Sequence, residues 1–130
     1  MSNVITILPF LHPIGRAQFE ALADELLAAH GSGQTKTLFL PFEGFRTPQR
    51  QRELFQQEPR VTNADAWQSA HQYGLAVDFV PQVNGRWSWA GEHDWKMLPT
   101  IAERHGLLCP IPWDSAHVEH PKARQFLRMK

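Results

Sequence analysis

Residues 69–81 read Ser-Ala-His-Gln-Tyr-Gly-Leu-Ala-Val-Asp-Phe-Val-Pro. The apolar run at 75–80, ended by Pro81, predicts a buried strand in which alternate side chains share a face. Asp78 then lies in the middle of an otherwise apolar strand, where a carboxylate is costly to bury unless it is paired or bound to a metal. A hydrogen-bonded structural aspartate and a metal ligand both meet this demand, so the strand alone leaves the two alternatives open.

The composition limits the class of protein. A chain of 130 residues with no repeat, low-complexity tract or linker suits one domain, 1–130. Thirteen Lys and Arg residues balance thirteen Asp and Glu residues, so we expect no general attraction to nucleic acid. The single cysteine, Cys109, excludes an intrachain disulfide framework and a thiolate-rich zinc site. No apolar stretch reaches the roughly 18 residues of a membrane span, and seven histidines are an excess that needs explaining.

Two helices are predicted before the strand. Apolar residues recur at helical spacing over 16–30, and Gly31 is placed to end that helix. A second helix carries Pro48 in its first turn and extends to about Gln57. Its residues Leu54 and Phe55 are expected to face inward.

Further extended segments flank these helices. Residues 4–8 predict an edge strand or an extended arm, and residues 37–42 are rich in β-formers but broken by Pro41. The turn at 83–86 contains Asn-Gly and predicts a hairpin, so that 87–89 returns antiparallel to the buried strand.

The last third of the chain predicts two helices and a short strand. A helix over 92–105 would be kinked by Pro99 and stopped by Gly106, a turn and strand follow at 113–120, and a helix is expected over 121–129. The fold class is therefore α+β, a small domain with an antiparallel sheet and helices packed mainly on one side.

A second cluster of polar residues reads Asp-Ser-Ala-His-Val-Glu-His at 114–120. A catalytic zinc site takes three protein ligands and keeps a fourth position open for water. His71, Asp78 and His117 would form such a set, and Asp114 could then act on the water without binding the metal. His120 is an alternative ligand, but with His120 in that role His117 would occupy the position of the acid. Spacing alone does not decide between a metal site and a structural cluster.

Three motifs carry a family resemblance. Residues 69–78 fill every fixed position of S-x-H-x-x-G-x-A-x-D, the signature of the zinc D-alanyl-D-alanine carboxypeptidase family, which includes the phage L-alanyl-D-glutamate endopeptidases. Residues 114–119 resemble the D-x-x-H-F-E form of its second motif, and residues 44–51 resemble G-[FY]-R-[ST]-x-x-x-Q. The three occur in the expected order and span more than half of the chain.

The resemblance implies a Hedgehog/D,D-peptidase-like fold and a role for each site residue. Zinc would be held by His71, Asp78 and His117, with Asp114 as general base. Arg46 would contact the substrate and stabilise the oxyanion, since a guanidinium binds carboxylates and developing negative charge. The candidate substrate-binding residues are Arg46, Gln51, Ser69 and Trp113. Gln51 is also placed to order the Arg46 loop, and Ser69 to form hydrogen bonds within its motif.

Two departures from the family pattern bear on specificity. Carboxypeptidases and dipeptidases of the family generally have Glu where Asp114 stands, whereas the phage endopeptidases commonly have Asp. This favours hydrolysis of the L-alanyl-D-glutamate bond in the peptidoglycan stem peptide. Val118 replaces a frequent aromatic residue, which we expect to alter packing only. The alternatives are a D-alanyl-D-alanine carboxypeptidase or dipeptidase and, in another class, a non-catalytic zinc-binding module.

The resemblance also suggests a cellular setting. The sequence begins without a basic and apolar leader, so we expect synthesis in the cytoplasm. We expect the protein to reach the bacterial cell wall by phage-type lysis and to act there as an endolysin does. We also expect a monomer.

Overall fold

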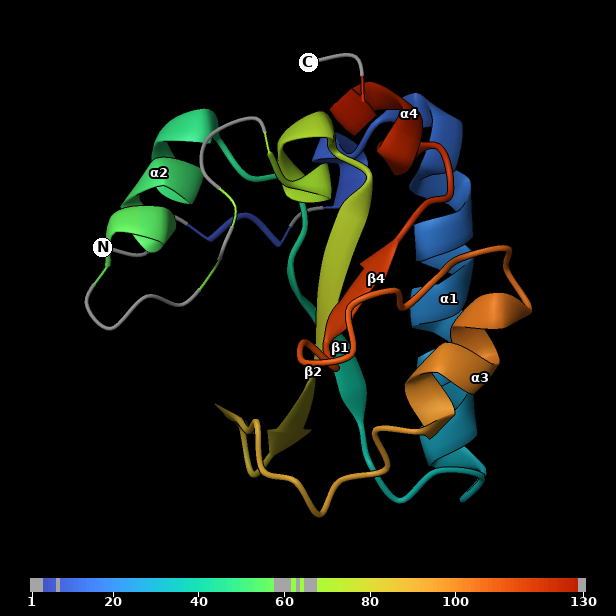
Figure 1. The fold of residues 1–130 in the computed structure, drawn as a ribbon. Helices are drawn as coiled ribbons and strands as arrows, with labels where there is room; N and C mark the ends of the chain where they lie inside the picture. The colour runs from blue at the N-terminus through green and yellow to red at the C-terminus, as the bar shows by residue number, and fades with distance from the viewer. Residues whose placement is uncertain (1–3, 7, 58–61, 63, 65–67, 129–130) are drawn as a thin grey trace.

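A four-stranded antiparallel sheet forms the centre of the protein (Figure 1). The computed structural model describes residues 4–6, 8–57, 62, 64 and 68–128. Strand β2 (Ala76–Val83) pairs with β1 (Phe39–Glu43) along one edge. Along its other edge it pairs with β4 (His117–Glu119) and then with β3 (Arg86–Trp87). The predicted α+β class is confirmed.

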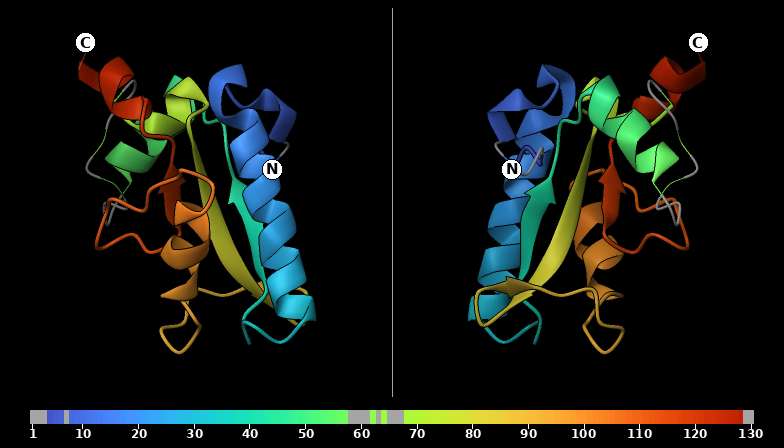
Figure 2. Two further views of the ribbon diagram at one scale, coloured as in Figure 1. Left: turned by 90° about the vertical axis from the view of Figure 1, so that its right-hand side faces the viewer. Right: turned by 90° about the vertical axis from the view of Figure 1, so that its left-hand side faces the viewer.

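Two helices cover one face of this sheet (Figure 2). They are α1 (Pro13–Gly31) and α3 (Met97–Glu103). Val77 and Phe79 of β2 point into the core beneath them, whereas Asp78 points to the opposite face, as the predicted alternation requires. The core consists of Leu11, Phe19, Leu22, Leu26, Ala29, Phe39, Val77, Phe79, Leu98, Ile101, Ala102, Leu107 and Val118. Packing of α1 and α3 against this core keeps both helices on one face of the sheet. The opposite face, which carries Asp78, is left free for a site.

The remaining helical segments surround that second face or close its end. Helix α2 (Pro48–Gln56) lies across the sheet from α1 and α3 (Figure 1). Short 3₁₀ helices occur at η1 (Leu8–Phe10) and η2 (Ala70–Tyr73), and η2 packs against α4 (Ala123–Arg128). None of the described helices is long and apolar enough to cross a membrane.

Two prolines, one expected to break a strand and one expected to end a strand, lie inside strands. The Phe79 amide donates to Ala116 O on the β4 side of β2, so it faces away from β1. Pro41 and Phe79 are register partners, and no backbone hydrogen bond joins them. Pro41 therefore needs no amide hydrogen for the ladder. Along its second edge, β2 pairs with β4 up to Asp78 and with β3 from Gln82 onward. The nitrogen of Pro81 lies between these two paired stretches, where no ladder hydrogen bond is lost. The expected break at Pro41 and the expected strand end at Pro81 were wrong for this reason.

The predicted helix over 92–105 was wrong at its start. Helix α3 begins at Met97, which puts Pro99 in the first turn, where no intrahelical donor is needed and no kink results. Asp94 instead donates its amide to Thr37 Oγ1, so the preceding segment is tied to the chain before β1.

Other predicted elements are confirmed with shifted bounds. The hairpin turn has Asn84 and Gly85 at positive φ, which matches the right-handed twist of the strands it joins. Residues 4–6 form an arm rather than a strand, and Ile5 O accepts from the Gly44 amide at 2.8 Å. In α2, Leu54 and Phe55 are only half-buried, and Gln51 is the buried residue.

Gly74 ends η2 at φ +68°, where a Cβ atom would lie 2.7 Å from the backbone nitrogen of His12. Gly74→Ala is expected to lower the free energy of unfolding by about 3 kcal/mol, because backbone strain and a backbone clash add. Gly85→Ala is the control, since it has φ +77° but nothing within 4 Å, and about 1 kcal/mol is expected from strain alone. Urea unfolding measures both, and equal losses would show that the close approach to His12 carries no cost.

Candidate functional site

A row of three polar residues crosses the free face of the sheet. Glu43 of β1 lies opposite Asp78 of β2, and Asp78 lies opposite His117 of β4. Glu43 and His117 are buried, and the Asp78 side chain is 17% exposed. The strand register thus brings together residues that are 35 and 39 positions apart in the chain.

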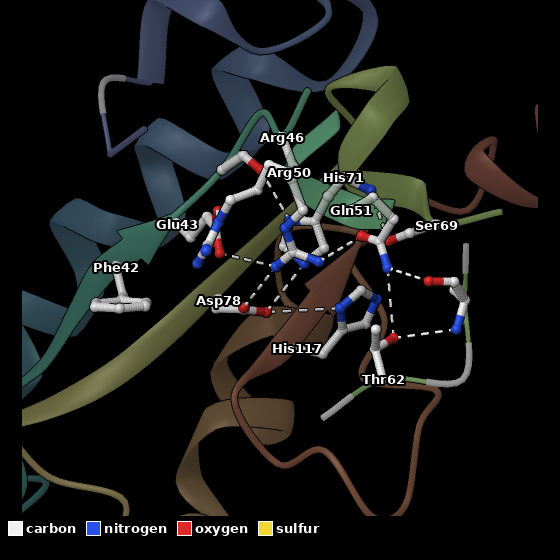
Figure 3. Close-up of polar contacts among 12 residues, drawn as sticks. Phe42, Glu43, Arg46, Arg50, Gln51, Thr62, Ser69, His71, Asp78 and His117 are labelled. Carbon is white, nitrogen blue, oxygen red and sulfur yellow. Dashed lines mark hydrogen bonds and ion pairs between the residues drawn. The ribbon is translucent and has the colours of Figure 1, made fainter. Parts of the chain in front are cut away.

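His71 reaches this row from η2. Ser69 caps the helix by accepting from the His71 amide, and Gly74 ends it one turn later. His71 Nδ1 donates to Gly44 O at 2.8 Å, and this hydrogen bond turns Nε2 toward Asp78 Oδ1, 3.1 Å away (Figure 3). The sequence predicted this juxtaposition of His71 and Asp78.

The two imidazoles meet at Asp78. His117 Nδ1 lies 3.6 Å from Asp78 Oδ1, and the centroid of its ring is 5.1 Å from that of His71. One donor atom from each of His71, Asp78 and His117 lies within 4.8 Å of the other two. Two imidazole nitrogens and one carboxylate oxygen are a donor set suited to a catalytic divalent metal.

Outer partners fix both rings. His117 uses Nε2 to contact Glu119 Oε1 at 2.8 Å, and Glu119, 1% exposed, accepts from Arg124 Nε at 2.9 Å. Each imidazole therefore has one nitrogen held by the protein and the other directed at the site. Metal-binding histidines need this second contact for orientation and basicity, so the residues present fit a bound metal.

A buried cationic group lies beside Asp78. Arg46 donates from its terminal nitrogens to Gln51 Oε1 at 2.7 Å and to Glu43 Oε1 at 2.9 Å, and one of them lies 3.5 Å from Asp78 Oδ2 (Figure 3). Arg46 Nε is buried and, within the described part of the chain, has no hydrogen-bond partner. Arg50 Nε also donates to Glu43, at 3.1 Å. Glu43 thus holds two arginines at the edge of the site.

These charges shift the acidities of the site residues. Burial opposes ionisation of Asp78, but the His71 and His117 rings outweigh it and hold the pKa of Asp78 well below its usual range. Burial also opposes the charged form of His117, but Asp78 and Glu119 outweigh it and raise the pKa of His117 to about 9. Burial, followed by the negative charge of Asp78, raises the pKa of Asp114. A raised pKa makes the Asp114 carboxylate a stronger base.

A cleft of about 670 Å³ opens over the row. Asp114 lines it from the turn before β4, with its carbonyl accepting from the His117 amide at 3.2 Å. Trp113, 79% exposed, and Ser69 also line it, although the Ser69 hydroxyl is engaged in the η2 cap. Gln51 is fully buried behind Arg46, the position expected of a residue that orders the Arg46 loop.

The alternative ligand His120 points elsewhere. Its Nε2 contacts Gln18 Oε1 at 2.9 Å, and its ring lies against Gly15 of α1. Among the described residues, His71, Asp78 and His117 form the one group of three or more potential ligands close enough to share an ion. His117 is therefore the better choice for the third ligand.

Sequence reasoning missed the residues that support the site. The motifs assign no role to Glu43, Arg50 or Arg124. Glu119 is the last residue of the motif at 114–119, but no function was assigned to it. The pattern that could have found Glu119 is its spacing of two from His117, which places both side chains on one face of a strand. Glu43 and Arg50 could be found only from the pairing of β1 with β2.

Comparison with known proteins finds a family to which part of the chain is similar. Residues 62–120 match the sequence profile described as D-alanyl-D-alanine carboxypeptidase. The chain is similar to this family over that segment, which is less than half of its length. It is accordingly a metallopeptidase, as the three motifs predicted, and the matched segment includes the two histidines, Asp78 and Asp114.

Two solved structures share the fold of this peptidase. The L-Ala D-Glu endopeptidase ChiX of Serratia marcescens aligns at 21% identity with a TM-score of 0.56, over 92% of this chain and 86% of its own. The LD-carboxypeptidase LdcB aligns at 18% identity with a TM-score of 0.65, over 99% of this chain and 68% of its own. No curated protein sequence matches the chain.

Gln51 tests how the Arg46 loop is held. Gln51→Leu keeps the side-chain volume but removes the acceptor for Arg46 and Gln72, so we expect a loss of about 2 kcal/mol in the free energy of unfolding. Gln49→Leu on the same helix is the control, because Gln49 is exposed and its one described bond is 3.4 Å long. Urea unfolding compares the two, and a neutral Gln51→Leu would mean that the carboxylates of Glu43 and Asp78 are sufficient to hold Arg46.

Proposed function

We propose that this peptidase is a zinc-dependent peptidoglycan hydrolase that cleaves the L-alanyl-D-glutamate bond of the stem peptide. The observation that carries the proposal is the convergence of His71, Asp78 and His117 at an open cleft, with Asp114 beside them. The aspartate at position 114 favours the endopeptidase, and a structural relative named as an L-Ala D-Glu endopeptidase supports it. The family description favours the second candidate, a D-alanyl-D-alanine carboxypeptidase.

The donor set supports zinc as the metal. His71, Asp78 and His117 would hold it, leaving a position open toward the cleft. Zinc bound there would supply a Lewis acid for the scissile carbonyl and for the attacking water. Glu119 and Gly44 O would keep the two rings in the orientation that binding needs.

The protein's own residues would handle protons and charge. The Asp114 carboxylate takes a proton from the attacking water and delivers it to the leaving amine. Its raised pKa suits both halves of that transfer. Arg46 places a buried positive charge next to Asp78 and the cleft, where it stabilises the negative charge that develops on the substrate oxygen. Glu43 and Gln51 hold that guanidinium in place before substrate arrives.

Asp114→Asn tests the base without removing a ligand. We expect zinc content to stay near one per chain while hydrolysis of peptidoglycan falls by roughly 100-fold or more. Elemental analysis and a turnover assay on the same sample measure the two. Ser115→Ala, one exposed residue further along, is the control and should keep both. Wild-type turnover in Asp114→Asn, or loss of zinc together with activity, contradicts the assigned role.

Digestion of purified peptidoglycan identifies the bond. Mass spectrometry should find new D-Glu amino termini, because hydrolysis of an L-Ala–D-Glu amide frees the amine of D-Glu. Release of free D-Ala would favour the carboxypeptidase instead. No product from a zinc-loaded protein would favour the non-catalytic zinc-binding module.

A further inference from the structure

Three aromatic residues form a cluster at the surface beside the cleft. Phe42 packs edge-on against Trp87 and Trp89, with ring centroids 5.1 and 5.3 Å apart. Trp87 is 37% exposed and Trp89 57% exposed, so neither serves the core. We call Phe42, Trp87 and Trp89 the aromatic platform. An exposed cluster of large flat rings is characteristic of a binding surface.

The segment that carries Trp89 is held in one position. The Ser88 amide donates to Pro81 O at 2.9 Å, and the Ser88 hydroxyl contacts His93 Nε2 at 2.8 Å. Further along, Trp95 Nε1 donates to Ala90 O at 2.8 Å. A platform fixed before its ligand arrives loses little conformational entropy on binding.

The platform continues into the proposed active site. Trp89 lines the same cleft as Asp78 and Asp114. Phe42 directly precedes Glu43 at the bulge of β1, and Glu43 is the register partner of Asp78 (Figure 3). A ligand on the platform is therefore adjacent to the bond being cleaved.

The cleft and the adjoining platform differ in charge. Arg46, Arg50 and Arg124 line the part over the metal ligands and suit the carboxylates of a stem peptide. The platform itself contains no ionisable side chain, which suits a neutral ligand that offers C–H groups to aromatic rings. Sugar rings have that character, and an extended acidic peptide does not.

We propose that the aromatic platform binds the glycan strand of peptidoglycan. This inference rests on the proposed function. The first stem residue, L-Ala, is joined to the lactyl group of N-acetylmuramic acid, so the sugar lies one residue from an L-Ala–D-Glu bond. When that bond lies in the active site, the sugar lies next to the catalytic centre, on the side where the platform can contact it. A bond at the D-Ala end of the stem would place the sugar several residues away.

Paired substrates test the proposal. The disaccharide–tetrapeptide carries both sugar and peptide, and the N-acetylated tetrapeptide carries the peptide alone. We expect Trp89→Ala to raise KM for the glycopeptide by roughly tenfold, the effect of losing one stacking contact and its buried area. The kinetics on the sugar-free peptide should stay unchanged, which also shows that the variant is folded. Trp89→Phe should restore most of the affinity.

Phe10→Ala provides the matched control. Phe10 is 60% exposed, similar to Trp89, but does not line the cleft. Its KM should be unchanged on both substrates. Equal KM values for the two substrates in the wild-type protein, or an equal rise on both in Trp89→Ala, would overturn the platform while leaving the peptidase assignment intact.

A binding measurement separates this proposal from the catalytic one. Chitotetraose, a glycan without peptide, is titrated into the zinc-loaded protein and followed by the indole N–H resonances in NMR spectra. Shifts of Trp87 and Trp89 in the wild-type protein, with loss of the Trp87 shift in Trp89→Ala, support the platform even if no peptide is cleaved. No shift at millimolar glycan, with peptide cleavage retained, refutes the platform alone.

Discussion

The structure depends on how one carboxylate, Asp78, is accommodated on the central strand. Burial alone would raise its pKa and destabilise its charge. Three groups from three separate segments offset this cost: Arg46 after β1, His71 from η2 and His117 from β4. A shift of one residue in the pairing of β2 would turn Asp78 into the apolar core. The core and the site therefore enforce the same strand register.

The neighbours of Asp78 have partners of their own, so the site is a connected network. Arg46 is held by Glu43 and Gln51, and His117 by Glu119. Buried polar groups stabilise a fold only when nearly all of them are satisfied, since each unpaired one costs its full desolvation. The side chains around the cleft are thus fixed by one another before any ligand binds.

The sequence predicted the parts of the fold that depend on local pattern. The alternation over 75–80 and the turn at Gly74 brought His71 and Asp78 together, and the family resemblance, not the spacing, selected His117 as their partner. The passage of the strands through Pro41 and Pro81 could not be predicted, because it depends on which edge each backbone nitrogen faces once the strands are paired. The roles of Glu43 and Arg50 depend on the same pairing and were missed for the same reason.

The spacing of three between Asp114 and His117 has a structural cause. The turn closes when the His117 amide donates to Asp114 O, so the base on the loop is tied directly to a residue of the strand. The ligand's ring is fixed in turn by Glu119. A displacement of β4 would consequently move base and ligand together and preserve their separation. Trp113, which is exposed, directly precedes Asp114, so a side chain that lines the cleft is carried on the same turn as the base.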